Sequence, residues 1–478
     1  MRIPEPGPFG ETFFDASVRA MVAASLVNRP SGGCVESVVT VRTQRRPVRF
    51  VATATVTADR APAIIRNVIT RSKAAFAFIF ITVLLDMISF GVIIPVFPQL
   101  ILQLQGGDMA GAAAIFGIFG TAFAVMQFVF SPVQGALADR FGRRPVILLS
   151  NLGLGLDYAV MALAPNIPIL FVGRLVSGAT AASYSISGAY IADVAPPQDR
   201  AAKFGMLGAA FGIGFIVGPA IGGLLGAIDL RAPFWFAAAL STANFLYGLF
   251  ILPESLPAER RSPFRLRNAN PVGALRFLGS SPVLLSLAVA MLFAFLGTDA
   301  IPNTFVLYTT YRFAFDERAI GISLAIVGAA SLVVNGFLVG RVVKLLGEFN
   351  TLLTGLGFGI ASQLLFAFAP VAGLFLGGLP LYALSGLSNG PLQSIASREV
   401  QPNEQGKLQG ALMSLRSVIT LVTPGIYTAT FALFVGPLAG VGLPGAPYVL
   451  AAFLMAASAA LLIRSATTLR SPAVARSS

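Results

Sequence analysis

The chain has 478 residues, of which 56% are hydrophobic and 11% are charged. A soluble globular protein carries about 25% charged residues, so this chain has too few charges to cover a water-facing surface. The net charge of +13 would suit a nucleic-acid partner, but the Lys and Arg residues lie between apolar blocks, which favours loops on the cytoplasmic side of a membrane.

The residue types also limit the chemistry. Cys34 is the one cysteine, so no disulfide can form within the chain, and histidine is absent. Histidine is the commonest general base and the commonest metal ligand. No cluster with metal-ligand spacing remains among the other residues. We therefore expect no enzyme, no metal site, no cofactor and no nucleic-acid partner.

Residues 1–72 differ from the rest of the chain. They are mixed in composition, with arginines and prolines, and they hold no sustained apolar block. The apolar run Met21–Val27 is far shorter than the roughly 20 residues that a membrane-spanning helix needs. No signal peptide is recognisable. Two interpretations stay open: a disordered cytoplasmic extension, or translation that really begins near Ile69–Lys73.

Apolar blocks of spanning length then follow one another to the carboxyl end. They lie at about 74–102, 111–134, 145–165, 167–191, 203–227, 232–252, 282–308, 319–343, 349–369, 372–396, 408–435 and 444–464. The longest break, 253–281, is polar and basic and divides the blocks six and six. The sequence therefore predicts an all-α polytopic membrane protein. We expect 12 transmembrane helices in two pseudo-symmetric six-helix bundles, residues 73–252 and 282–464, with a linker at 253–281 and a tail at 465–478.

The distribution of positive charge predicts the orientation. We number each loop by the expected helix that it follows. The odd loops hold Arg231, Arg312 and Arg318. The even loops hold many more basic residues: Arg140, Arg143, Arg144, Arg200, Lys203, Arg260, Arg261, Arg265, Arg267, Arg276, Arg341, Lys344, Arg398 and Lys407. Positive residues stay on the cytoplasmic side, so we expect the even loops and both termini to be cytoplasmic.

A glycine-framed basic loop follows the expected helix 111–134. It reads GALADRFGRR, and a similar loop, Gly336–Gly347, lies at the equivalent place in the second half. Repeated halves with a site between them are typical of secondary transporters. We expect the first loop to act as a latch that breaks and re-forms as the halves rock; the alternative is a simple topology anchor. The residues concerned are Gly135, Asp139, Arg140, Gly142, Arg143 and Arg144.

The expected helix 203–227 is rich in glycine. It reads GAAFGIGFIVGPAIGG from Gly208 to Gly223. Glycines on one face allow tight helix packing, and a proline bends the helix. The marked residues are Gly208, Gly212, Gly218, Pro219, Gly222 and Gly223.

Charged residues inside the expected helices point to ion coupling. They are Asp86, Asp157, Arg174 and Asp299. A charged side chain facing lipid costs about 2.5–3.5 kcal/mol or more, so these residues should face the bundle interior. A buried carboxylate can bind and release protons, which makes the three acids proton-coupling candidates. Contact with water at a helix end is the alternative for Asp86 and Asp157, and snorkelling is the alternative for Arg174.

Polar residues of the second half are candidates for contact with a substrate. They are Asn335, Gln363, Tyr382, Asn389, Gln393 and Arg416. Gln363 and Asn389 equally suit hydrogen bonds between helices. Arg416 has three interpretations: it pairs with an acid such as Asp299, binds an anionic group of the substrate, or snorkels to the helix end.

The loop GALADRFGRR resembles the loop motif of the major facilitator superfamily. Within that superfamily, the chain is similar to the tetracycline-efflux branch of the drug–proton antiporters over about residues 74–464. The similar stretches are Leu84–Asp86, Asp139–Pro145, Leu156–Tyr158, Gly173–Arg174, Gly208–Gly223, Ile320–Ala325 and Gln405–Gly410. The glycine-proline helix is similar to the antiporter motif, and the superfamily has an arginine linked to proton transfer at the place of Arg174.

The resemblance implies proton-coupled efflux of small amphipathic drug-like compounds by alternating access. It also implies a monomer in the bacterial inner membrane, with a small molecule, protons and the lipid bilayer as partners. The sequence departs from the branch in three places. The branch has a histidine near the place of Ser331, an acid within the stretch that matches Gly355–Ser362, and an uncharged residue in place of Arg416. Proton-coupled uptake or exchange of a small organic anion is the alternative function.

Overall fold

A computed structural model describes residues 37–42, 47–52, 61–181, 183–195, 199–261, 271–401 and 404–465. Contacts divide the chain into two units, Met1–Ala77 and Phe78–Ser478. The first unit contains an antiparallel pair of strands, β1 (Ser37–Arg42) and β2 (Pro47–Ala52). Val and Thr residues, which favour strands, recur through β1.

These strands fall inside the expected extension 1–72, for which a disordered segment is one of the two interpretations. The helix α2 (Ala61–Ile93) also begins before residue 73, so the expected boundary lies inside a helix. The other residues of the extension, and the tail from 466 onward, lie outside the described part of the chain. The two interpretations of the extension therefore stay predictions.

We call the second unit, Phe78–Ser478, the membrane unit. After α2, its first half contains helices that follow the expected apolar blocks. They are α3 (Phe97–Leu104), α4 (Met109–Phe141), α5 (Arg143–Leu163), α6 (Ile167–Thr180), α7 (Ser183–Val194), α8 (Arg200–Gly226) and α9 (Ala232–Phe250). The linker contains one short turn of 3₁₀-helix, η1 (Ala258–Arg260), and the helix α10 (Pro271–Leu278).

The second half has more interruptions than the first. Its helices are α11 (Pro282–Thr298), α12 (Ala300–Phe313), α13 (Glu317–Val333), α14 (Val339–Leu346), α15 (Glu348–Phe368), α16 (Ala372–Leu384), α17 (Asn389–Arg398), α18 (Gln405–Val435) and α19 (Ala446–Arg464). Between them lie the π-helix η3 (Val334–Leu338) and the 3₁₀-helices η4 (Ser385–Ser388) and η6 (Ala439–Val441).

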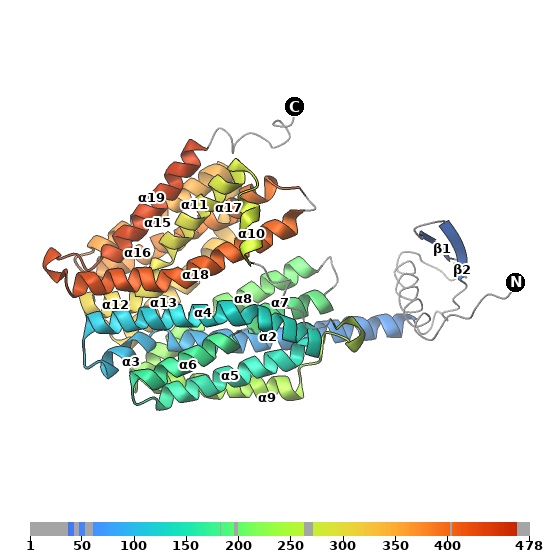
Figure 1. Cartoon of the computed structure of the whole chain (residues 1–478), viewed down its shortest axis with the longest axis horizontal. Coiled ribbons are helices and arrows are strands. Elements are labelled where there is room, and N and C mark those ends of the chain that lie inside the picture. Colours follow the sequence, from blue (N-terminus) through green and yellow to red (C-terminus); the bar gives the residue numbers. More distant parts are fainter. Residues whose placement is uncertain are drawn as a thin grey trace. The chain divides into compact units, whose positions relative to one another are not determined.

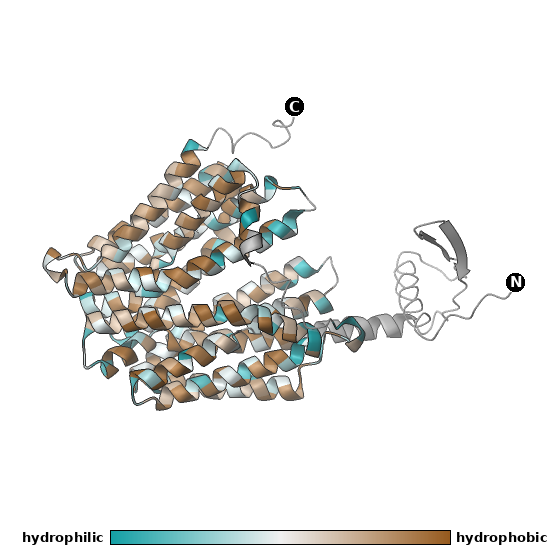
Figure 2. Ribbon diagram, in the orientation of Figure 1, coloured by the Kyte–Doolittle hydropathy of each residue, from teal (hydrophilic) through white to brown (hydrophobic). Residues whose placement is uncertain are grey.

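Among the described residues, ten helical segments are long and apolar enough to cross a membrane. The segments α9 and α16–η4–α17 occupy the places of the other two expected spans. In Figure 2, hydrophobic residues recur along the helices from one end to the other, as expected for helices of a membrane protein. The prediction of an all-α polytopic membrane fold is therefore confirmed for the membrane unit.

The two halves meet where α8 packs on α13 and α4 packs on α18 (Figure 1). At the ends of these helices near the odd loops, the contact leaves no room for a side chain on the glycines. A Cβ atom added to Gly223 would lie 2.9 Å from Cα of Gly321, and one added to Gly120 would lie 2.8 Å from Cβ of Pro424. Only glycine fits at such positions, so the halves are held closely together at this end, the odd-loop end.

The helices α8 and α13 separate toward the opposite, even-loop end. A Cβ atom added to Gly212 of α8 would still lie 3.7 Å from Leu332 of α13. One helical turn further along α8, a Cβ atom on Gly208 would meet nothing within 4 Å, and the same holds for Gly336 and Gly340 on the facing helix. The helix surfaces that pack together at one end therefore lie apart at the other.

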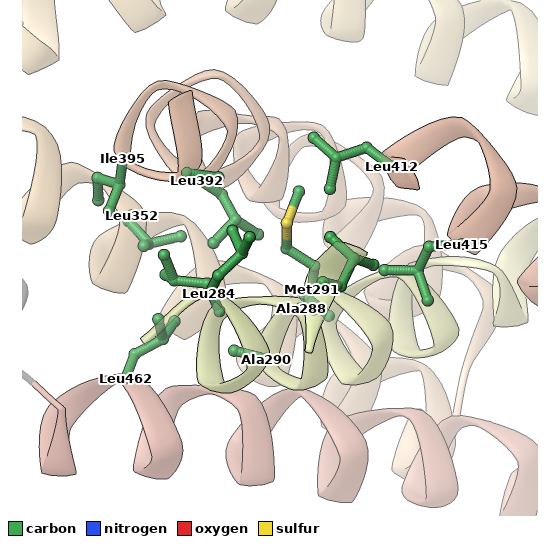
Figure 3. Close-up of a cluster of buried hydrophobic side chains, with 14 of the residues drawn as sticks. Leu284, Ala288, Ala290, Met291, Leu352, Leu392, Ile395, Leu412, Leu415 and Leu462 are labelled. Atoms are coloured by element: carbon green, nitrogen blue, oxygen red, sulfur yellow. The ribbon is translucent and has the colours of Figure 1, made fainter. Parts of the chain in front are cut away.

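The core of the second half gathers around α11. Buried side chains from α11, α15, α17, α18 and α19 pack into one apolar cluster, which includes Met291, Leu352, Leu392, Leu412 and Leu462 (Figure 3). Met291 and Leu412 also line the cavity described below. This cluster therefore forms a fixed wall behind the cavity.

Candidate functional site

The seventh expected span is broken at Asp299, which ends α11 and precedes α12. In an α-helix the Thr298 carbonyl would accept a hydrogen bond from the backbone N–H of residue 302. Residue 302 is a proline and has no N–H, so this carbonyl lacks its helical donor. Side chains from three other helices supply donors to successive carbonyl groups at the break. Tyr427 donates to Leu296 (2.7 Å), Gln363 to Gly297 (3.0 Å) and Tyr382 to Thr298 (3.1 Å).

Asp299 lies at this break and pairs with Arg416 of α18. Nη2 of Arg416 lies 2.8 Å from Oδ1 of Asp299, and the hydroxyl of Thr423 lies 3.3 Å from Oδ2. The guanidinium of Arg416 also lies over the Phe295 ring, 5.4 Å from its centre. The Asp299 side chain is 9% exposed, whereas that of Arg416 is 45% exposed. The pairing that the sequence left as one of three interpretations is thus present.

A cavity of about 420 Å³ opens beside this pair. Two irregular segments border it: η3, which holds Asn335, and η4. Broken and unwound helices at mid-membrane are the usual setting of a transporter's binding site, and π-helices recur at functional sites. The lining residues are Met291, Phe295, Thr298, Ser331, Asn335, Tyr382, Ala383, Ser385, Gly386, Asn389, Gln393, Gln409, Leu412, Met413 and Arg416.

Five of the six substrate-contact candidates line this cavity: Asn335, Tyr382, Asn389, Gln393 and Arg416. Gln363 does not. Its side chain is fully buried and its amide donates to the Gly297 carbonyl, so it supports the helix break. The apolar lining residues Phe295 and Met413 were missed because nothing in the sequence separates a cavity wall from a core or lipid-facing position.

In the first half, Asp86 is buried on α2. The Ser183 hydroxyl lies beside its carboxylate. That hydroxyl is also within hydrogen-bonding distance of Ser150 (2.8 Å) and Asn151 (3.1 Å). Oδ1 of Asp86 is buried without a hydrogen-bond partner. A buried anion with one oxygen left without a donor is costly, which suits a carboxyl group that takes up a proton.

Asp157 and Arg174 form a second buried charged group, on α5 and α6. Neither carboxylate oxygen of Asp157 has a hydrogen-bond partner, and Nε and Nη1 of Arg174 also lack one. The guanidinium lies against the rings of Phe123 (4.4 Å) and Phe97 (5.1 Å). Tyr158 is close enough to interact electrostatically with Asp86, Asp157 and Arg174. These residues therefore lie in one connected region of the first half.

Gly173 explains how Asp157 fits against α6. A Cβ atom added to Gly173 would lie 2.7 Å from Oδ1 of Asp157. Any side chain at this position would push the carboxylate away from its place. The dipeptide Gly173–Arg174 therefore supplies both the space for the acid and the positive charge beside it.

The latch residues gather at the even-loop end, between α4 and α5. Arg143 contacts two acids: Nη1 lies 2.6 Å from Asp139, and Nε lies 3.2 Å from Asp193 of α7. Arg140 lies against the Phe141 ring, 5.2 Å from its centre. A Cβ atom added to Gly135 would meet nothing within 4 Å. The expected group thus comes together around Arg143, and Gly135 makes no close approach.

Glu254 joins the latch from the segment that follows α9, and the sequence analysis missed it. Its carboxylate accepts the backbone N–H groups of Arg143 (2.9 Å) and Arg144 (3.3 Å) at the start of α5. Gly142 has φ 110°, which favours glycine, and an added Cβ would lie 2.7 Å from Cδ of Glu254. Two sequence signals were available: a glycine directly before a helix, and an acid directly after an apolar block.

The second half has a smaller counterpart of the latch. Gly347 has φ 77° directly before α15, as Gly142 has before α5. Glu348 then pairs with Arg398 at the end of α17 (2.6 Å) and accepts from Ser394 (3.0 Å). The repeat suggested by Gly336–Gly347 therefore extends to the placement of charges at helix ends.

The glycine-rich helix α8 packs on two neighbours. A Cβ atom on Gly218 would lie 2.6 Å from Cα of Gly91 on α2, and Gly222 also lies against α2, at Val92. Gly223 faces α13 instead. Pro219 lies inside α8, between these contacts. Gly218, Gly222 and Gly223 thus serve helix packing within the first half and across the two halves, whereas the expected packing role of Gly208 is wrong for this conformation, since an added Cβ there meets nothing within 4 Å.

Two groups of membrane-spanning helices pack together at one end, and broken helices of the second half border a cavity. This arrangement is typical of a secondary transporter. The model of the Major Facilitator Superfamily matches residues 79–424, and the chain belongs to this superfamily.

Individual relatives narrow the comparison. The chain is 38% identical over 362 residues to the tetracycline resistance protein, class C, of Escherichia coli, a match that covers 76% of this chain and 91% of that protein. It is 30% identical over 285 residues to multidrug resistance protein 2 of Bacillus subtilis, covering 59% and 69%. The crystal structure of the human organic anion transporter MFSD10 superposes with a TM-score of 0.60 at 25% identity, covering 82% of this chain and 99% of that one. These relatives support a role in drug efflux.

Proposed function

We propose that the protein exports small amphipathic compounds from the cytoplasm in exchange for protons, by alternating access. The observation that carries this proposal is the cavity beside Arg416, in a molecule whose halves pack together at the odd-loop end and separate toward the even-loop end. The cavity is of a size that suits a drug-sized molecule. The relatives named for tetracycline and multidrug resistance support the direction of transport.

The two halves would have different roles in transport: the second half would bind the substrate and the first half would bind protons. The second half supplies the cavity, with amide groups and apolar side chains on its walls. The first half supplies two buried acids, Asp86 and Asp157, with oxygens that lack hydrogen-bond donors. Protons taken up there would change the charge of the first half and so favour one opening of the molecule over the other.

The proposal includes a place and an orientation. The protein would be a monomer in the bacterial inner membrane, with the even loops and both termini in the cytoplasm. The even-loop opening would then face the cytoplasm, where the substrate enters. Most of the basic residues in the loops between helices belong to the even loops, as the positive-inside rule requires for a cytoplasmic side.

The test uses inverted membrane vesicles that contain the full-length protein. An imposed pH gradient, acid inside, should drive accumulation of tetracycline, and dissipation of the gradient should abolish it. Asp86→Asn should remove gradient-driven accumulation. The matched control is Asp199→Asn, at an even loop where the side chain makes no helix-capping bond. Accumulation that persists in Asp86→Asn would remove this residue from the coupling mechanism.

A further inference from the structure

We propose that the cavity receives its substrate through an acidic group that replaces Asp299 as the partner of Arg416. This inference rests on the proposed function only in taking the cavity as the substrate site. The substrates that it selects are amphipathic molecules with one planar anionic group, such as a carboxylate or an enolate.

Arg416 is the charged group that the cavity offers. Among the described residues that line it, the others are uncharged, and Asp299 is not part of the lining. The structure gives the Arg416 guanidinium one hydrogen bond, from Nη2 to Asp299. A guanidinium has five N–H donors in a planar fork that matches carboxylate oxygens in pairs. Donors therefore remain for a second planar anion.

The pair is asymmetric in a way that favours exchange. Asp299 is nearly buried at the helix break, whereas the Arg416 side chain is 45% exposed. Oδ2 of Asp299 accepts from the Thr423 hydroxyl at 3.3 Å, a contact that does not involve Arg416. Asp299 can also take a proton once its cationic partner turns to the substrate, so that no unpaired charge is left buried. Tyr382 and Tyr427 hold the neighbouring carbonyls and keep the break in place.

The rest of the lining fits an amphipathic anion. The Phe295 ring lies beside the Arg416 guanidinium, 5.4 Å from ring centre to guanidinium carbon, and offers an apolar surface next to the charge. Met291, Leu412 and Met413 form an apolar wall for the body of the molecule. Gln393 and Gln409 hydrogen-bond each other at 3.1 Å on the side near the even loops, where they can contact polar substituents.

The test measures binding of two probes to the purified full-length protein in detergent by calorimetry. The probes are naphthalene-2-carboxylate and naphthalene-2-carboxamide, which share shape and apolar area and differ in charge. The wild-type protein should bind the carboxylate at least ten times more tightly than the carboxamide. Arg416→Gln should abolish this preference and keep carboxamide binding, and Arg416→Lys should keep part of it. Arg341→Gln is the control, since Arg341 does not line the cavity.

The exchange itself is tested by Asp299→Asn. Removal of the competing carboxylate should strengthen carboxylate binding several-fold and leave carboxamide binding unchanged. Weaker carboxylate binding in Asp299→Asn would mean that Asp299 only positions Arg416, and it would overturn the exchange. Equal binding of the two probes by the wild type, or no binding of the carboxylate, would overturn the proposal as a whole. The failure of this proposal can be told apart from the failure of the proposed function. If the binding results overturn the role of Arg416 but the Arg416→Gln variant still exports an uncharged drug when a pH gradient is imposed, the proposed function stands without it.

Discussion

Arg143 and Asp193 lie 3.2 Å apart at the ends of α5 and α7, and in the second half Glu348 and Arg398 make the equivalent contact with the charges exchanged. In both halves, the first partner directly follows a glycine with positive φ. The two contacts therefore join equivalent pairs of helices at the even-loop end. The contact in the first half is more buried and also includes Asp139.

Because the first half carries the same contact with the charges exchanged, the charges of Glu348 and Arg398 should be interchangeable. The Arg398 side chain is 68% exposed, so the contact with Glu348 should be worth at most about 1 kcal/mol. Glu348→Arg or Arg398→Glu alone should slow transport by up to about fivefold, since like charges would then face each other. The double variant should recover most of the wild-type rate in vesicles. Additive losses in the double variant would show that the two residues act separately.

Gly142 should tolerate no side chain. Its φ of 110° and its contact with Glu254 predict that Gly142→Ala strains the backbone and displaces the cap of α5. We expect a loss of about 1–3 kcal/mol in the free energy of unfolding. Gly135→Ala is the matched control, because an added Cβ there meets open space in a helix interior. Melting of the purified protein in detergent measures both, and equal melting temperatures would contradict the prediction.

Gln363 and Asn389 should differ in what they affect, although the sequence treats them alike. Gln363→Ala leaves the buried Gly297 carbonyl without its donor, which should cost about 1–3 kcal/mol in the free energy of unfolding. Substrate affinity should change little. Asn389→Ala, on the cavity wall, should lower substrate affinity and leave the melting temperature nearly unchanged. Thermal melting and calorimetric binding of the same two variants separate these outcomes.

These cases show what the sequence can and cannot predict. Apolar blocks predict spans because a bilayer demands a minimum length, and every expected span has a helical segment in its place. The break at Asp299 has a local signal, Pro302, but the donors that stabilise it come from residues 64 to 128 positions away. The π-helix η3 and the 3₁₀-helix η4 have no such signal, since both depend on packing between helices. The same limit applies to Glu254, whose partners are distant in sequence.

The separation of α8 and α13 predicts a difference between two glycines of the same helix. Gly223→Ala would push against Gly321 where the halves are in contact, so it should disfavour this conformation and favour the one that opens at the odd-loop end. Gly208→Ala should be tolerated in the present conformation, because the added Cβ meets open space. Alternating access brings the even-loop ends of the helices together in the other conformation, so the same variant should disfavour that conformation. Cysteine labelling can measure the two populations once Cys34 is replaced by serine. A cysteine at Asn389, on the cavity wall, should react more slowly from the even-loop side in Gly223→Ala and faster in Gly208→Ala. Equal rates in both variants would show that these glycines do not set which end is open.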